Sequence, residues 1–171
     1  DKYKTWSSEG YERRFAKIAG SLYPVEDFKL SWQFRVREED EWLNWIDSNE
    51  LGVYDLTQKI ISINANWFKG SKHEIRLKSQ FVALEAENPI SLILDKAGYL
   101  YNHNSNVRPF TDGITSFQIR YKYEIVPLSY IYIVYTKGGR VYDDENERNT
   151  SDVFKDPWDN PDNEIFSLKF R

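Results

Sequence analysis

The stretch Phe28–Arg37 reads FKLSWQFRVR and alternates strictly between apolar and polar side chains. Successive side chains of a β-strand point to opposite faces, whereas a helix would scatter these apolar residues around its circumference. The stretch therefore predicts a strand with an apolar face formed by Phe28, Leu30, Trp32, Phe34 and Val36. The segments 117–125 (FQIRYKYEI) and 165–171 (IFSLKFR) repeat the same alternation.

Weaker copies of this pattern fill most of the remaining chain. Aromatic residues make up 16% of the 171 positions and there are only 8 glycines, a composition that favours strands over helices. We predict seven antiparallel strands, over residues 11–23, 27–37, 54–68, 73–86, 115–126, 129–137 and 163–171. A chain of this length suits one domain, so residues 1–171 are expected to form a single domain.

The connections between these strands alternate between short and long. The short ones are 24–26, 69–72 and 127–128, and the long ones are 38–53, 87–114 and 138–162. This rhythm places every long loop at one end of the sheet, which is typical of a barrel that crosses an outer membrane with short periplasmic turns and long extracellular loops. The sequence therefore predicts an all-β fold, an antiparallel up-and-down transmembrane β-barrel segment.

Periodicity alone leaves open which face meets water. In a soluble sandwich the apolar face points inward, whereas in a membrane barrel it faces lipid and the polar side chains line the lumen. Two features favour the membrane: rows of large charged side chains on the polar face, and aromatic residues near strand ends, as in interfacial girdles. The aromatic residues concerned are Trp32, Trp67, Tyr121, Tyr123 and Tyr135.

The overall composition excludes several classes of function. The chain has no cysteine, which removes disulfides, thiolate metal sites and cysteine nucleophiles. Its formal net charge of −4 gives no basic field that would attract nucleic acid. Two histidines, His73 and His103, are too few for a histidine-rich metal centre. The chain also has no methionine, so Asp1 is expected to follow a cleavage or to begin a fragment.

Two regions of the sequence resemble one protein family. They are the segment 54–83, which runs from YDLTQK through NWF and the turn KGSK to HEIRLKSQFVA, and the segment 117–135. The family consists of large bacterial outer-membrane proteins of unknown function, which join an N-terminal sandwich like carbohydrate-binding module family 9 to a C-terminal membrane barrel. The resemblance covers roughly residues 11–171 and implies the last strands of that barrel. It brings no catalytic motif, so no catalytic residue is expected.

The strand count raises a question of closure. Single-chain bacterial barrels normally have an even number of strands, at least eight, and an open barrel would expose unpaired backbone groups to lipid. We therefore expect a C-terminal piece whose edges pair, within the lipid bilayer, with other strands of the same barrel or of a partner chain. The segment Glu164–Arg171 alternates as the last strand of such barrels does, although Arg171 is not aromatic.

The predicted polar face supplies the first candidate site. Five of its cationic residues are expected to line the lumen: Arg35, Arg76, Lys78, Arg120 and Lys122. A basic lumen favours anions such as acidic glycans, phosphate or carboxylates. A structural interpretation is also open, in which these cations pair with Glu74 or Glu124 across a plugged interior.

The long segment 138–162 supplies a second candidate site. It carries clustered carboxylates, and Asp156, Trp158 and Asp159 are the predicted ligand-binding residues. Carboxylate and amide oxygens are ligands that Ca²⁺ prefers, and a tryptophan ring can stack on a sugar. The spacing of an EF-hand is missing, and a solvated acidic loop would explain the same residues. No cofactor is therefore predicted, and Ca²⁺ remains the candidate metal.

These observations together predict a non-catalytic β-barrel component of a bacterial outer membrane, acting in transport, surface binding or assembly. Two alternatives stay open. A soluble carbohydrate-binding β-sandwich would bury the aromatic faces in a dry core and use loop tryptophans as stacking platforms. A cell-surface hydrolase would need two carboxylates at a suitable separation, and Glu41 or Asp159 would then be essential for activity.

Overall fold

Five of the seven long strands are longer than the sequence predicts. The structure, a computed structural model, describes residues 12–144 and 150–171. In chain order the elements are β1 (Arg13–Val25), β2 (Phe28–Asp47), β3 (Glu50–Lys69), β4 (His73–Leu94), β5 (Leu100–Asn102), β6 (Phe110–Val126), β7 (Ser129–Asp143), α1 (Thr150–Asp159) and β8 (Asn163–Phe170).

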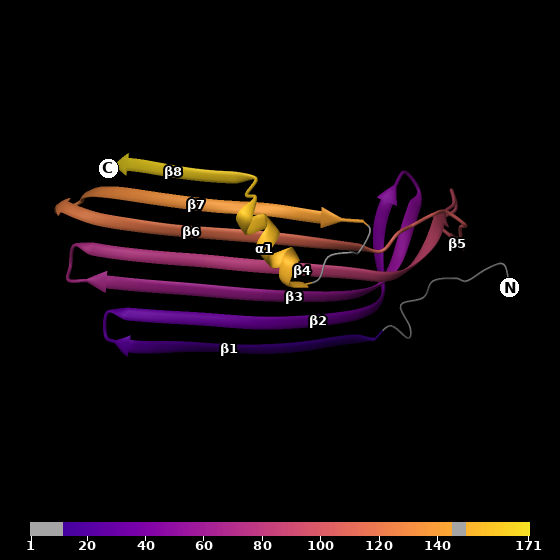
Figure 1. Cartoon of the computed structure of the whole chain (residues 1–171), viewed down its shortest axis with the longest axis horizontal. Helices are drawn as coiled ribbons and strands as arrows, with labels where there is room; N and C mark the ends of the chain where they lie inside the picture. The colour runs from indigo at the N-terminus through magenta and orange to yellow at the C-terminus, as the bar shows by residue number, and fades with distance from the viewer. Residues whose placement is uncertain (1–11, 145–149) are drawn as a thin grey trace.

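All the strands belong to one antiparallel sheet (Figure 1). The seven long strands follow one another in the order β1-β2-β3-β4-β6-β7-β8, and the short β5 pairs with the far end of β4. The predicted all-β, antiparallel up-and-down arrangement is therefore confirmed. Strands β1 and β8 form the two edges, and in the described part of the chain they do not pair, so this sheet is not closed into a barrel.

The prediction of a long loop over 38–53 is wrong. Strands β2 and β3 continue through this segment as paired strands and reverse at a turn formed by Ser48 and Asn49. The extension is held by aromatic packing, because the ring of Trp42 lies 6.1 Å from that of Tyr54 and 6.4 Å from that of Phe110. These residues form an apolar cluster with Ala86, which lies on the opposite face of the sheet from the apolar alternation quoted above.

The other two predicted long loops also contain secondary structure. Strand β4 extends to Leu94 and β6 begins at Phe110, so the segment 87–114 is a loop only in part. Strand β7 extends to Asp143, and residues 150–159 form the helix α1 instead of a loop. Within the described residues, this helix is too short and too polar to span a membrane.

The strand register aligns the alternating apolar side chains of all seven long strands on one face, here called the apolar face, while the Trp42 cluster lies on the other. One cross-strand row on it consists of Leu22, Leu30, Ala65, Leu77, Ile119, Tyr135 and Phe166. Much of this face is open to solvent, with Ile18 63% exposed and Phe166 69% exposed. A dry sandwich core would bury Phe28, Leu30, Trp32, Ile119 and Tyr121, but none of these five is buried in this sheet.

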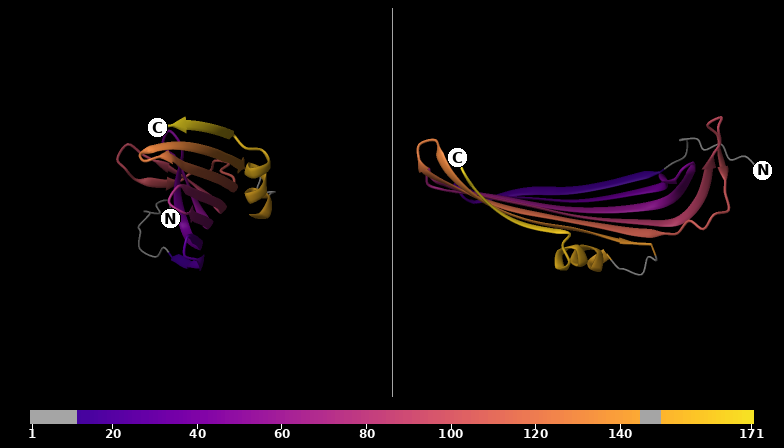
Figure 2. Two further views of the ribbon diagram at one scale, coloured as in Figure 1. Left: turned by 90° about the vertical axis from the view of Figure 1, so that its left-hand side faces the viewer. Right: turned by 90° about the horizontal axis from the view of Figure 1, so that it is seen from above.

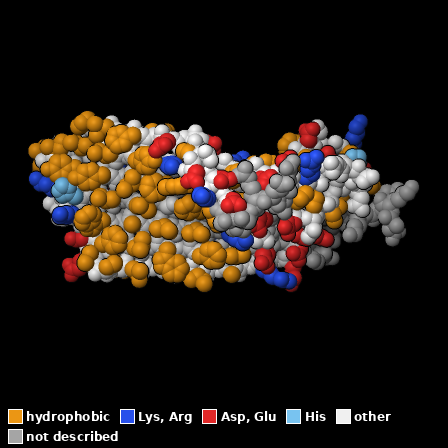
Figure 3. Space-filling view, in the orientation of Figure 1, with side chains coloured by type: hydrophobic (Ala, Val, Ile, Leu, Met, Phe, Trp, Pro, Cys, Tyr) orange, Lys and Arg blue, Asp and Glu red, His pale blue; other side chains and the backbone are white. Residues whose placement is uncertain are grey.

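Helix α1 packs on the apolar face and leaves most of that face uncovered. The sheet bends along its length so that both ends turn away from the helix, which therefore lies on the convex side (Figure 2). Hydrophobic side chains cover the same face over the half of the sheet that ends in the β1–β2, β3–β4 and β6–β7 turns (Figure 3). The polar side chains alternate with these residues and therefore occupy the opposite, concave side.

The three short turns do not lie level with one another across the sheet. Phe28 at the start of β2 pairs with Trp67, and β3 continues two residues further, to Lys69. His73 at the start of β4 pairs with Tyr123, and β6 continues three residues further, to Val126. On average, each hairpin thus extends about 8 Å further along the strands than the one before it. Neighbouring hairpins are two strand spacings apart, which is about 9.6 Å across the sheet. If the turns lie in one plane, the strands are tilted by about 40° from the normal to that plane.

The apolar face also has a limit at its other end, away from the short turns. From β2 to β7 this limit shifts toward the short turns. On β2 the first charged side chain of this face is Glu38, which lies in one row with Asp143 of β7. On β7 the first charged side chain is Lys137, six residues nearer the turns than Asp143. The apolar side chains of β2 and β7 therefore mark an oblique band, here called the apolar band, whereas on β4 the first charged side chain of this face, Glu85, lies in the row of Glu38.

Candidate functional site

The polar face carries most of the cationic side chains of the sheet. Among the described paired residues, its cations are Arg13, Lys17, Lys29, Arg35, Arg37, Arg76, Lys78, Arg120, Lys122, Arg140 and Lys169. Its carboxylates are Glu39, Asp47, Glu50, Glu74, Asp112 and Glu124. The chain as a whole has a net charge of −4, so the fold concentrates positive charge on this one face. Such a surface attracts anions.

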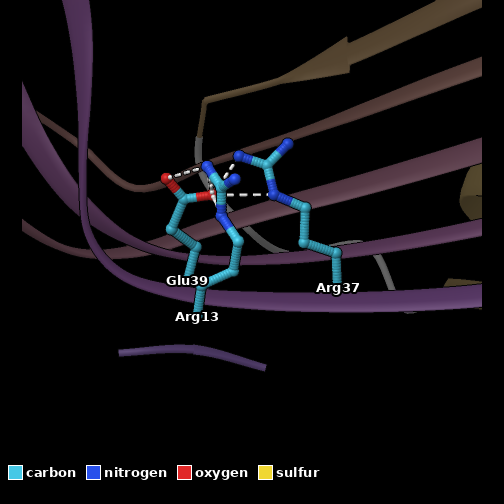
Figure 4. A network of polar contacts seen from close by, with 3 residues as sticks. All are labelled: Arg13, Arg37 and Glu39. Carbon is cyan, nitrogen blue, oxygen red and sulfur yellow. Dashed lines mark hydrogen bonds and ion pairs between the residues drawn. The ribbon is translucent and has the colours of Figure 1, made fainter. Parts of the chain in front are cut away.

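A buried carboxylate organises the cations at the end of the polar face away from the short turns (Figure 4). Glu39 of β2 is 2% exposed and accepts hydrogen bonds from Nε and Nη2 of Arg13 at 3.1 Å each. Arg37 of β2 donates a third hydrogen bond from Nε at 2.7 Å. Strand pairing explains the arrangement, because Arg13 lies directly opposite Glu39 and Arg37 precedes it by two residues on the same face.

A second carboxylate organises the cations near the short turns. Glu74 of β4 accepts a hydrogen bond from Nη2 of Arg120 at 3.1 Å and lies 3.7 Å from Nζ of Lys122. Arg76 also forms an ion pair with it. Three cations thus share one carboxylate within the sheet, whereas a plugged interior stays a prediction. The cluster nevertheless keeps an excess of positive charge.

The centre of the polar face, between these two ion clusters, is built differently. Two adjacent rows on β3, β4 and β6 carry neutral hydrogen-bonding side chains around one cation, Lys78. They surround a hollow of about 320 Å³, whose lining includes Ser62, Asn64, Lys78, Gln80, Ser116 and Gln118. The sequence analysis singled out Lys78 but missed the amides and hydroxyls, because short polar residues in alternating strands look like ordinary solvated positions until the register aligns them.

The five predicted lumen residues share one face. Arg35 lies on β2, Arg76 and Lys78 on β4, and Arg120 and Lys122 on β6, and the register puts all five side chains on the polar face. Nε of Arg35 is buried and has no hydrogen-bond partner in the described part of the chain. Whether this face lines a lumen stays a prediction at this point.

The three predicted ligand residues of the segment 138–162 lie on helix α1, not in a loop. Trp158 packs onto the apolar face, with its ring 5.5 Å from that of Phe117 and with Nζ of Lys137 4.7 Å from its ring centroid. Asp159 lies 3.9 Å from Nζ of Lys155. The indole packs against the sheet and is half-buried, and its role in ligand binding stays a prediction.

Metal binding finds no support in the described residues. They contain no group of three or more His, Asp or Glu side chains that could hold an ion. Part of the acidic stretch that suggests Ca²⁺, residues 145–149, lies outside the described residues.

Two carboxylates at the end of the sheet away from the short turns have shifted pKa values. Hydroxyl hydrogen bonds from Ser105 and then Ser91, the latter at 2.9 Å, lower the pKa of Glu50. The backbone N–H of Tyr99, at 2.9 Å, is the main cause that lowers the pKa of Asp95, and the hydroxyl of Tyr101 at 3.0 Å adds to it. Both carboxylates stabilise local turns and strand ends and lie well away from the hollow around Lys78.

Comparison with known proteins gives no homologue to guide the assignment. No protein-family model matches the chain, and neither the curated proteins nor the solved structures give a significant match.

Proposed function

We propose that this chain forms part of an antiparallel β-barrel in a bacterial outer membrane, acting in transport or surface binding. The apolar band faces the hydrocarbon of the bilayer, and the polar face borders a water-filled lumen. The short turns lie on the periplasmic side, and the longer connections lie outside the cell. The proposal agrees with the resemblance to the large bacterial outer-membrane proteins described above.

The observation that carries this proposal is the oblique apolar band. A bilayer imposes two parallel boundaries, so strands tilted within it must show upper and lower limits that shift together from strand to strand. Between β2 and β7 the charged limit shifts by six residues toward the short turns, and between β2 and β6 the limit at the turns shifts by five residues in the same direction. The tilt of about 40° that the hairpin turns imply falls within the range of about 35–45° for transmembrane barrels.

The height of the band also suits a membrane. On β2 ten residue steps separate Phe28 from Glu38, and on β7 eight steps separate Ser129 from Lys137. At about 3.3 Å per residue and a tilt of about 40°, these intervals span about 20–25 Å. Outer-membrane barrels have an apolar band about 25 Å tall.

Helix α1 lies where the proposal places the membrane surface. It packs over Gly113 and Gly139, and on β7 Gly139 lies just beyond Lys137, the charged limit of the band. Its apolar residues face the sheet, while Lys155 and Asp159 remain exposed. An amphipathic element with an indole and outward charges suits the headgroup region.

The open edges add a requirement to the proposal. Within hydrocarbon, unpaired N–H and C=O groups cost several kcal/mol each, so a membrane-inserted sheet must continue at both β1 and β8. The barrel is therefore completed by further strands, either of the same protein or of a partner. A soluble carbohydrate-binding sandwich would instead need a second layer to cover the apolar band, and the described residues form one sheet.

The chain's lack of cysteine permits a direct test. Single cysteines are placed at positions 75 to 80 of β4, in the chain reconstituted in lipid vesicles, and labelled with a water-soluble maleimide. We expect labelling at positions 76, 78 and 80, and protection at 75, 77 and 79. Spin-labelled lipids should quench a fluorophore at the protected positions. The opposite alternation, or a chain that stays monodisperse in buffer without detergent, would refute the membrane assignment.

A further inference from the structure

The hollow around Lys78 combines one positive charge with a dense set of neutral hydrogen-bonding groups. Its volume of about 320 Å³ lies at the lower end of the range of about 300–1,000 Å³ for small-molecule sites. Asn64, Gln80 and Gln118 supply amides, which both donate and accept hydrogen bonds, and Ser62 and Ser116 supply hydroxyls. Three adjacent strands contribute these groups, so backbone pairing fixes their spacing.

These groups are available to a ligand. Over residues 12–144 and 150–171, none of the six side chains makes a hydrogen bond or ion pair with another protein group. The ion clusters on either side differ in this respect, because Glu39 is bound by two arginines and Glu74 by three cations. The carboxylates of the two flanking clusters are therefore already engaged, and within the described residues the ammonium group of Lys78 makes no ion pair.

The chemistry of the hollow selects a class of ligand. A single ammonium group suits a ligand with one negative charge, whereas tight phosphate sites usually use the bidentate fork of arginine or several cations. The surrounding amides and hydroxyls match a ligand that carries several hydroxyl groups. An acidic sugar combines one carboxylate with several hydroxyls.

We propose that this hollow binds one acidic sugar unit, with its carboxylate on Lys78 and its hydroxyls on the flanking amides and serines. The inference deepens the proposed function and rests on it, since a water-filled lumen is what makes the polar face accessible to such a ligand. The two flanking ion clusters, each with excess positive charge, raise the local concentration of anions and so assist entry from either end.

Calorimetric titration of the lipid-reconstituted chain with glucuronate, glucose and inorganic phosphate tests the site. We expect glucuronate to bind at least tenfold more tightly than glucose or phosphate. Lys78→Gln should weaken glucuronate binding at least tenfold. Gln80→Ala combined with Gln118→Ala should weaken glucuronate binding several-fold without changing that of phosphate. Lys17→Gln is the matched control, because Lys17 also lies on the polar face but outside the hollow, and it should leave binding unchanged.

The inference would be overturned by equal affinity for glucuronate and glucose, by equal effects of Lys78→Gln and Lys17→Gln, or by phosphate binding as tight as that of glucuronate. Its failure is distinguishable from failure of the proposed function. The cysteine accessibility pattern of β4 reports the membrane orientation without any ligand. If that pattern holds and glucuronate gives no heat, only the sugar site is refuted.

Discussion

Gly139 of β7 lies directly beneath Pro157 of α1, so close that a Cβ atom on Gly139 would come within 2.5 Å of the carbonyl oxygen of Pro157. The helix backbone therefore rests on the sheet backbone at this point. The neighbouring Gly113 of β6 plays the same part for Val153, which is fully buried. Gly113 and Gly139, in adjacent strands, thus form the surface against which the helix packs, here called the glycine seat.

Gly139→Ala should displace α1. The added methyl group meets backbone atoms, which cannot rotate away, and overpacking of this kind costs about 1–3 kcal/mol. The free energy of unfolding should fall by that amount, and the emission of Trp158 should shift because its contact with Phe117 is lost. Gly138→Ala is the control, because there the nearest atom would be 3.2 Å away and the methyl group points to the other face. Equal effects of the two substitutions would contradict the proposed seat.

Leu77→Arg and Asn64→Arg should have very different effects in a bilayer. Leu77 lies within the apolar band, whereas Asn64 lies on the polar face of the adjacent strand. An arginine on the lipid side near the bilayer midplane costs about 2–4 kcal/mol, whereas lumen positions tolerate charge. Urea unfolding of each variant from vesicles measures the difference. Comparable destabilisation by both substitutions would count against the membrane orientation.

The alternation of side chains was sufficient to predict the sheet. In the segments around Phe28 and Phe117 the period of two is strict, and pairing with neighbours on both sides then fixes the register. The alternation also placed the five predicted lumen cations on one face. What it could not show is how rows from different strands align, and therefore the oblique band and the hollow around Lys78 were not predicted.

Two errors have identifiable physical causes. The segment 38–53 was predicted as a connection between strands, but its acidic Glu39 pairs with Arg13, a partner far away in sequence, and β2 continues. The helix α1 was missed because Pro157 and the nearby acidic residues resemble a loop. Its stability depends on the glycine seat in β6 and β7, which only the folded sheet provides.

Glu39→Gln should weaken the attachment of β1 to β2. Loss of the carboxylate charge removes the ion pairs that Glu39 makes with Arg13 and Arg37, although the partial exposure of the two arginines lets water replace some of the interaction. We expect a loss of about 1–3 kcal/mol in the free energy of unfolding, as for a broken charged hydrogen bond. Glu38→Gln is the control: its ion pair with Arg14 is 4.0 Å long and exposed, and such pairs contribute about 0–1 kcal/mol. Hydrogen exchange of β1 amides should rise only in the Glu39 variant, and equal exchange in both would refute this role.

Ser105→Ala should reduce stability in a pH-dependent manner. The hydroxyl of Ser105 is the main cause that lowers the pKa of Glu50, so the folded state favours the ionised carboxylate. A carboxyl group whose pKa is lowered on folding contributes stability above its ordinary pKa of about 4.3, and this contribution disappears as the pH falls through the folded-state value. Wild type should therefore exceed Ser105→Ala in unfolding midpoint at neutral pH, and the difference should shrink below pH of about 4. Ser71→Ala, at an exposed turn position, serves as the control and should show no such trend. A difference between wild type and Ser105→Ala that stays constant from neutral to acidic pH would show that the hydroxyl acts through packing and not through the charge of Glu50.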